Sequence, residues 1–178
     1  MNYSTFDKTN TQEVVDLFSS TFSSSEGENE DRVLGHLVSK LSSNINNNDI
    51  IGFGAYKDAS LIGAIFFTRL NFNDSNRVYM LSPVAVSTEH QGMGVGQALI
   101  QYGLDELRSR SVSVVVTYGD PAFYSKVGFE SLSEEVIQAP MKLSMPEGWL
   151  GQSLIDKPIP VINECPICVE AFNDLSLW

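Results

Sequence analysis

The chain has 178 residues, of which 43% are hydrophobic and 19% are charged. This balance is typical of one globular domain with a substantial core. Asp and Glu outnumber Lys and Arg by 22 to 11, so the formal net charge is −11. Such acidity argues against nucleic acid as a partner, because phosphate binding needs clustered cationic side chains. It allows a weak long-range attraction of cationic substrates.

No apolar run approaches the roughly 20 residues that span a bilayer. The N-terminal sequence MNYSTFDKTN has no readable signal peptide. We therefore expect a cytoplasmic protein with no membrane partner.

The two cysteines, Cys165 and Cys168, stand close together in the sequence CPIC. A structural zinc site needs four ligands, and the two histidines, His36 and His90, are far away in the sequence. A redox CxxC pair normally opens a helix after a strand, and that context is absent here. We expect free, reduced thiols and no bound metal.

The first forty residues predict two amphipathic helices. The first is expected to begin near Asn10 or Thr11, with Glu13 placed for a capping box. A polar loop over residues 23–30 follows. The apolar positions at helical spacing are Val14, Leu17, Phe18 and Phe22 in the first helix and Val33, Leu37, Val38 and Leu41 in the second.

Three strands and a long helix are predicted next. Strands over residues 49–56 and 61–72 flank a turn at 57–60, as in an antiparallel hairpin. A further strand covers 77–86. A helix of about fifteen residues then carries Val95, Ala98, Leu99, Tyr102 and Leu107 on one face.

After the long helix, a strand is predicted over residues 113–118. Their sequence, SVVVTY, has the continuous apolar character of a strand buried on both faces. A short helix is expected over residues 121–127, with Asp120 as its N-cap and Gly128 at its end. Short strands are expected at 129–132, at 139–144, and once or twice within 159–172. The order ααβββαβαβ, followed by further strands, predicts a mixed α/β domain.

Three glycines, Gly92, Gly94 and Gly96, lie between the strand at 77–86 and the long helix. A P-loop is excluded because no lysine follows the glycines. The Rossmann pattern GxGxxG fails, because its third glycine would fall on Gln97 or Leu99. The pattern QxxGxG fits from Gln91. Unpaired amides at the N-terminus of a helix that follows glycines can bind a pyrophosphate. Such local binding is especially important in this chain, because its net negative charge repels anions.

The strand VAV followed by STEHQGMGVGQALI resembles the acyl-CoA-binding signature of the GNAT superfamily of N-acetyltransferases. The downstream GDPAFYSKVGF resembles the tyrosine-bearing helix and following strand of the same superfamily, and VVVTYGDPAFYSKVGF is similar to its YhbS-like branch. The resemblance is best over residues 79–129 and extends plausibly over all 178.

This resemblance implies one GNAT domain over residues 1–178. Residues 1–48 would form acceptor-side helices, 49–129 the acyl-CoA-binding core, and 130–178 C-terminal strands. The central sheet would splay open between the strands at 77–86 and 111–118, with the pantetheine arm pairing along the first of them. The implied cofactor-binding residues are Val84, Ala85 and Val86 for pantetheine and Gln91, Gly92, Met93, Gly94, Val95 and Gly96 for the pyrophosphate.

Tyr124 matches the superfamily's frequent general acid, which protonates the departing thiolate. The alternative is a ring that merely packs on the sheet. A backbone N–H at Val84 or Val86 would stabilise the oxyanion. Asp120 and Phe123 are further candidates for cofactor contact, with a helix cap and core packing as their respective alternatives.

The general base is open. Some members carry a catalytic glutamate where this chain has Met80. Ser82 shares a strand face with that position, and Glu30 belongs with Glu26, Glu28 and Asp31 to a region that often edges the acceptor pocket in this superfamily. We take Ser82 and Glu30 as candidates for the general base. The alternatives are that the acidic residues are solvated surface charges and that ordered water removes the proton.

The implied function is acetyl-CoA-dependent transfer of an acetyl group to a primary amine, on a small molecule or a protein, in a ternary complex. The alternative is a catalytically weak acyl-CoA-binding sensor or interaction domain. Another acyl donor is a third possibility. We expect a monomer or homodimer.

Overall fold

The computed structural model describes residues 1–23 and 28–178, without the side chain of Glu28. The chain forms two compact units, each assembled from separate stretches of sequence. The first comprises Met1–Phe67 and Pro83–Tyr102, and the second Thr68–Ser82 and Gly103–Trp178. The strands form one sheet in the order β1-β2-β3-β4-β5-β7-β6. Both parallel and antiparallel ladders occur in it, which confirms the predicted mixed α/β class.

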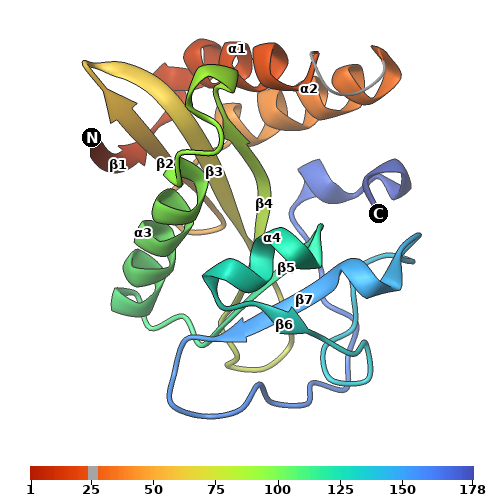
Figure 1. Ribbon diagram of the computed structural model, residues 1–178. Coiled ribbons are helices and arrows are strands. Elements are labelled where there is room, and N and C mark those ends of the chain that lie inside the picture. The colour runs from red at the N-terminus through yellow and green to blue at the C-terminus, as the bar shows by residue number, and fades with distance from the viewer. Residues whose placement is uncertain (24–27) are drawn as a thin grey trace. The chain divides into compact units, whose positions relative to one another are not determined.

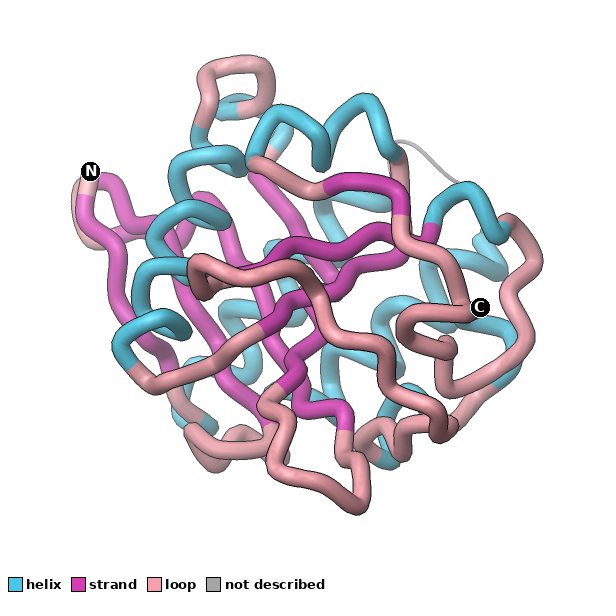
Figure 2. The backbone as a smooth tube through the Cα atoms, turned by 90° about the horizontal axis from the view of Figure 1, so that it is seen from below, coloured by secondary structure: helices cyan, strands magenta, loops and turns pink. Residues whose placement is uncertain are grey.

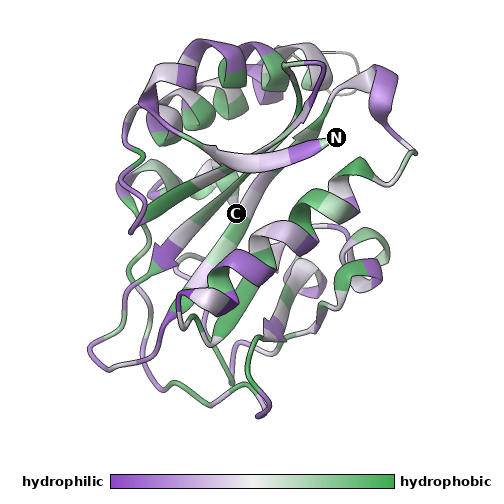
Figure 3. Ribbon diagram, turned by 90° about the vertical axis from the view of Figure 1, so that its left-hand side faces the viewer, coloured by the Kyte–Doolittle hydropathy of each residue, from purple (hydrophilic) through white to green (hydrophobic). Residues whose placement is uncertain are grey.

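The first unit combines two helices with the N-terminal half of the sheet. Its elements are β1 (Asn2–Phe6), α1 (Thr11–Phe22), α2 (Glu28–Ser43), β2 (Ile50–Lys57), most of β3 (Ser60–Leu70), the end of β4 (Val78–Val86) and the first half of α3 (Val95–Ser109). α1 and α2 lie side by side (Figure 1). Both helices alternate between hydrophobic and hydrophilic residues along their length (Figure 3), as their sequences predict.

The β2–β3 hairpin confirms the predicted turn at residues 57–60. Asp58 and Ala59 have φ values of 49° and 66°, the pair of left-handed conformations that a two-residue hairpin turn requires. β2, β3, β4 and α3 agree with the predicted elements to within two residues at most ends.

The N-terminal prediction is wrong in three respects. Residues 2–6 form strand β1, which pairs with β2. The capping box joins Asp7 and Asn10 around a short 3-10 helix, whereas Glu13 accepts a hydrogen bond from the Leu61 amide at 3.3 Å. α2 already begins at Glu28, inside the predicted polar loop. Residues 24–27 of that loop lie outside the described residues.

The second unit contains the strands that follow α3. The first part of β4 pairs in parallel with β5 (Val114–Tyr118), and β5 pairs antiparallel with β7 (Trp149–Ser153), which also pairs with β6 (Glu130–Ser131). The short helix α4 (Pro121–Tyr124) connects β5 to this region. The segment that leads to the C-terminus is mostly loop (Figure 2). It is fixed by Trp178, whose indole is buried and donates a hydrogen bond to the Phe172 carbonyl at 3.0 Å.

The C-terminal strand predictions are largely wrong. Residues 139–144 form no strand. Within 159–172 the chain makes isolated bridges, at Ile162 to Ile137 and at Ile167 to Asn71, and a 3-10 helix at Glu170–Phe172. The strand that lies between β5 and β6 in the sheet is β7, which was not predicted. No helix among the described residues is long and apolar enough to span a lipid bilayer.

We predict that Gly128→Ala destabilises the protein. Gly128 has φ +92°, which costs a non-glycine residue about 1–2 kcal/mol. A Cβ there would also lie 2.2 Å from Nε2 of Gln152. Gly35→Ala in α2 is the control, because nothing lies within 4 Å of its Cβ position and alanine is favoured in a helix by about 0.5–1 kcal/mol. Urea unfolding should give opposite shifts in the free energy of unfolding for the two variants. Equal midpoints would contradict the prediction.

Candidate active site

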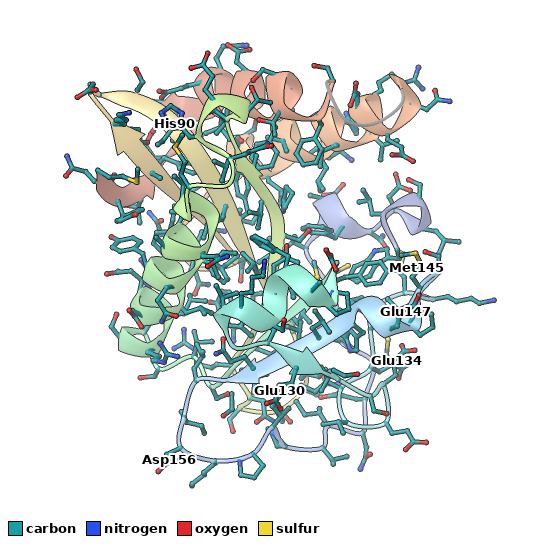
Figure 4. All side chains as sticks on the ribbon, viewed as in Figure 1. His90, Glu130, Glu134, Met145, Glu147 and Asp156 are labelled. Atoms are coloured by element: carbon teal, nitrogen blue, oxygen red, sulfur yellow. The ribbon has the colours of Figure 1, made fainter. Side chains whose placement is uncertain are left out.

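The turn after β4 is fixed by hydrogen bonds to strand backbone. The Gln91 side chain donates from Nε2 to the Val86 carbonyl at 3.0 Å. The Ser87 amide donates to the Ile62 carbonyl on β3 at 2.8 Å. His90 lies at this turn (Figure 4), with its Nδ1 2.8 Å from the Ser87 hydroxyl oxygen. The turn is therefore closed on itself before α3 begins.

Two glycines of this turn have backbone conformations that other residues rarely adopt. Gly92 and Gly94 have φ values of +72° and +78°. Nothing lies within 4 Å of a Cβ built at either position. Their conformation, rather than crowding by neighbouring atoms, therefore requires glycine, and both face open space.

The first turn of α3 offers amides to an anion. α3 begins at Val95, and the Ala98 amide donates to the Gly94 carbonyl at 3.0 Å. The amides of Val95, Gly96 and Gln97 precede this bond, at positions where a helix has no internal acceptor. The first turn contains no acidic residue. Partial positive charge at the helix N-terminus and open space before it suit a phosphate or pyrophosphate.

The end of β4 presents backbone groups beside this turn. Val84 and Val86 are half-buried and alternate with the buried Pro83 and Ala85. Because the Ser87 amide bonds to β3, the backbone groups of Val84 and Val86 point to the opposite edge of β4. The parallel ladder with β5 ends at Leu81 and Thr117, while β4 continues to Val86.

Tyr124 in the second unit is held by the short helix that the sequence predicted. The Asp120 carboxylate caps this helix by accepting from the Ala122 amide at 2.9 Å. Gly119 lets the tyrosine ring approach the backbone, since a Cβ at Gly119 would lie 2.7 Å from its Cε2 atom. The ring makes edge-on contacts with Phe123 and Phe129, at centroid distances of 5.0 and 5.7 Å.

The Tyr124 hydroxyl is set in a hydrogen-bonded, desolvated position. The residue as a whole is half-buried, but its hydroxyl group lies deep enough that desolvation raises the pKa. A hydrogen bond with Thr117 opposes this shift, and the Asp120 charge adds to it. Thr117 is fully buried and donates to the Leu81 carbonyl at 2.8 Å. Thr117 was not singled out in the sequence, because its role depends on a contact with a strand that is distant along the chain.

The base candidates fall into different units. Ser82 is half-buried in the second unit, the unit that holds Tyr124, whereas Glu30 is exposed on α2 in the first. Met80 is buried. Glu26 and the Glu28 side chain lie outside the described residues. Ser82 and Glu30 thus stay predictions.

The cysteine pair lies in the second unit. Cys165 is exposed, Cys168 is half-buried and both are free. Burial raises the pKa of the Cys168 thiol. Among the residues that the structure describes, no three His, Cys, Asp or Glu side chains are grouped so that they could hold a metal ion.

Comparison with known proteins gives consistent matches. The model of the acetyltransferase (GNAT) family matches residues 11–129. YjhQ of Escherichia coli strain K12, named an uncharacterized N-acetyltransferase, is 32% identical over 130 residues, with 69% of this chain and 71% of YjhQ covered. YhbS, an uncharacterized N-acetyltransferase of the same strain, is 34% identical over 74 residues, which cover 41% of this chain and 44% of YhbS.

Solved structures show the same fold. The crystal structure of E. coli YhbS in complex with CoA has a TM-score of 0.71 and 22% identity, and the match covers 87% of this chain and 82% of YhbS. A GNAT family acetyltransferase from Brucella melitensis in complex with acetyl-CoA has a TM-score of 0.67 and 21% identity, with 89% of this chain and 92% of that protein covered. With the match of the family model over most of the chain, these findings show that the protein belongs to the acetyltransferase (GNAT) family.

Proposed function

We propose that the protein is an N-acetyltransferase that uses acetyl-CoA to acetylate a primary amine by direct attack in a ternary complex. The observation that carries this proposal is the turn at residues 91–96, where two positive-φ glycines precede the first-turn amides of α3. Structures of related fold bind CoA or acetyl-CoA, which supports the same donor here.

The donor's pyrophosphate would lie against the backbone of residues 91–96. Amides and the helix dipole would supply the attraction, because the protein's net charge of −11 does not attract an anion. The pantetheine arm would pair with the end of β4. Val84 and Val86 point their backbone groups away from β3 and are the pairing residues, and the buried Ala85 packs behind them. Asp120 serves as the cap of α4, and contact of Asp120 or Phe123 with the cofactor stays a prediction.

When bound, acetyl-CoA supplies a thioester carbonyl and a thiolate leaving group. The acceptor amine must be neutral to attack this carbonyl. A backbone N–H of Val84 or Val86 would stabilise the negative charge that develops on the carbonyl oxygen. Tyr124 would hold a proton on its hydroxyl oxygen and donate it to the leaving sulfur. The raised pKa of Tyr124 keeps that proton in place at neutral pH. Ser82, Glu30 or an ordered water would accept the amine proton.

A second candidate function is a catalytically weak acyl-CoA sensor, and the residue that favours it is Met80. This side chain is buried and cannot act as a base. The discriminating experiment measures thiol release from acetyl-CoA with a panel of polyamines, amino acids and lysine peptides. We expect turnover with at least one amine. Acetyl-CoA binding without any turnover would favour the sensor.

We predict that Gln91→Ala weakens CoA binding. The variant loses the side-chain bond to the Val86 carbonyl that closes the turn, and a hydrogen bond of this kind is worth about 0.5–1.5 kcal/mol. Calorimetry should show a three- to tenfold rise in Kd, consistent with about 1 kcal/mol. Gln12→Ala on α1, where the glutamine bonds to the exposed Asp16, is the control and should leave Kd unchanged. An unchanged Kd for Gln91→Ala would show that this bond does not shape the donor site.

We predict that Tyr124→Phe lowers kcat and spares CoA binding. The ring contacts remain, but the proton donor is lost, and general acid catalysis typically contributes about 10²–10⁴-fold. Steady-state kinetics should show a loss of this size, with Kd for CoA within about twofold. Tyr3→Phe, on β1 of the first unit, removes a hydroxyl elsewhere and should leave kcat unchanged. Full turnover in Tyr124→Phe would show that Tyr124 is not the general acid.

A further inference from the structure

A cavity lies between α1 and α2 within the first unit. Its volume is about 100 Å³, well above the roughly 10–15 Å³ that a single water molecule requires. α1 contributes Phe18, Ser19 and Phe22, and α2 contributes Asp31, Leu34 and Gly35. Ser23, at the end of α1, also lines it. Three of the seven lining residues have apolar side chains, two are serines, and Asp31 carries the one carboxylate.

Asp31, which lines this cavity, has one carboxylate oxygen without a hydrogen-bond partner among the described residues. This atom, Oδ1, is buried. A buried charged oxygen without a partner is costly. The missing partner must donate a hydrogen bond, and a cation would compensate the charge as well. Solvated surface charges were one alternative that the sequence left open for the acidic residues of this region, whereas Asp31 is half-buried beside a cavity.

The aromatic side of the cavity suits the same kind of ligand. The rings of Phe18 and Phe22 lie almost parallel, with centroids 6.0 Å apart and an interplanar angle of 3°. Aromatic faces attract ammonium groups, and the Leu34 side chain can pack against methylene carbons. A carboxylate, aromatic rings and an aliphatic side chain are together suited to an alkylammonium group.

The cavity is connected to the end of β4 through α1. Thr21 directly precedes Phe22 on this helix. Its hydroxyl donates to the Leu17 carbonyl at 2.7 Å and also lies 3.5 Å from the Val86 carbonyl oxygen. Val86 is the last residue of β4 and belongs to the proposed donor site. A molecule that occupies the cavity therefore binds on the helix that contacts that strand end.

We propose that this cavity binds a second cationic group of the acceptor, so that the acceptor is a diamine or polyamine. The proposal rests on the proposed acetyltransferase function. An ammonium group paired with a carboxylate is held in its protonated form and cannot attack a thioester. The group at Asp31 is therefore not the amine that becomes acetylated. It positions a molecule whose other amine reacts, and the net charge of −11 attracts such polycations.

The test compares Asp31→Asn with Asp16→Asn, which removes the same charge from an exposed position on α1. Acetyl transfer is measured with 1,4-diaminobutane and with butylamine, and calorimetry measures diaminobutane binding in the presence of CoA. We expect Asp31→Asn to lower kcat/KM for the diamine about tenfold, the effect of losing roughly one charge-assisted hydrogen bond. The monoamine rate and the CoA affinity should not change, and Asp16→Asn should stay within about twofold of the parent. An equal loss for both amines, or no loss for either, would overturn the proposal.

A second variant guards against misfolding of Asp31→Asn. Gly35→Leu adds a side chain where nothing lies within 4 Å of the Cβ position, and leucine favours the helix. By filling the cavity it should reduce diamine binding and leave monoamine turnover intact. If no amine is acetylated but diaminobutane still binds in an Asp31-dependent way, the proposed function fails and the cation site stands. If amines are acetylated and diaminobutane binding is the same in both variants as in the parent protein, the cation site is wrong and the proposed function stands.

Discussion

The proposed donor site depends on one backbone constraint, the left-handed conformations of Gly92 and Gly94 at the entrance of α3. They direct the chain so that the first helical amides follow a closed, hydrogen-bonded turn. These amides would allow a protein of net charge −11 to bind a diphosphate at the proposed site. Exposed charges beyond about 8 Å are largely screened at physiological ionic strength, whereas amides that contact the phosphate oxygens directly are not.

The sequence predicted the elements whose patterns are strong and local. β2–β5 contain apolar runs that are typical of strands, and α3 has the periodicity of an amphipathic helix. β1 was missed because Phe6 is its one buried side chain, so an edge strand leaves no alternation to detect. β7 was missed because its sequence, WLGQS, includes Gly151, whose Cβ position lies only 3.0 Å from Leu132 and Ile159 atoms. Close packing that excludes a side chain weakens a strand pattern. Residues 139–144 include the apolar Ala139, Met141 and Leu143 but form no strand.

The site was predictable to the extent that single motifs define it. The glycine turn and the Asp120-to-Phe129 segment each fold from neighbouring residues, and the structure builds both as local units. The support of Tyr124 by Thr117 and Leu81 joins strands far apart in sequence. The cavity at Asp31 requires two helices to pack with a gap between them. Neither arrangement leaves a sequence pattern, and the base has no motif at all.

Donor and acceptor impose opposite electrostatic demands on this protein. Its acidity disfavours the anionic donor, which must be held by dipoles, and favours a cationic acceptor. Yet the reacting amine must lose its proton, and a nearby carboxylate would raise its pKa and slow that loss. An acidic residue that recognises the acceptor therefore works best on a different ammonium group. The buried oxygen of Asp31, which has no partner among the described residues and lies on a helix that packs beside α1, fits that requirement, because under the proposal its charge would recognise the substrate without holding a proton on the nucleophile.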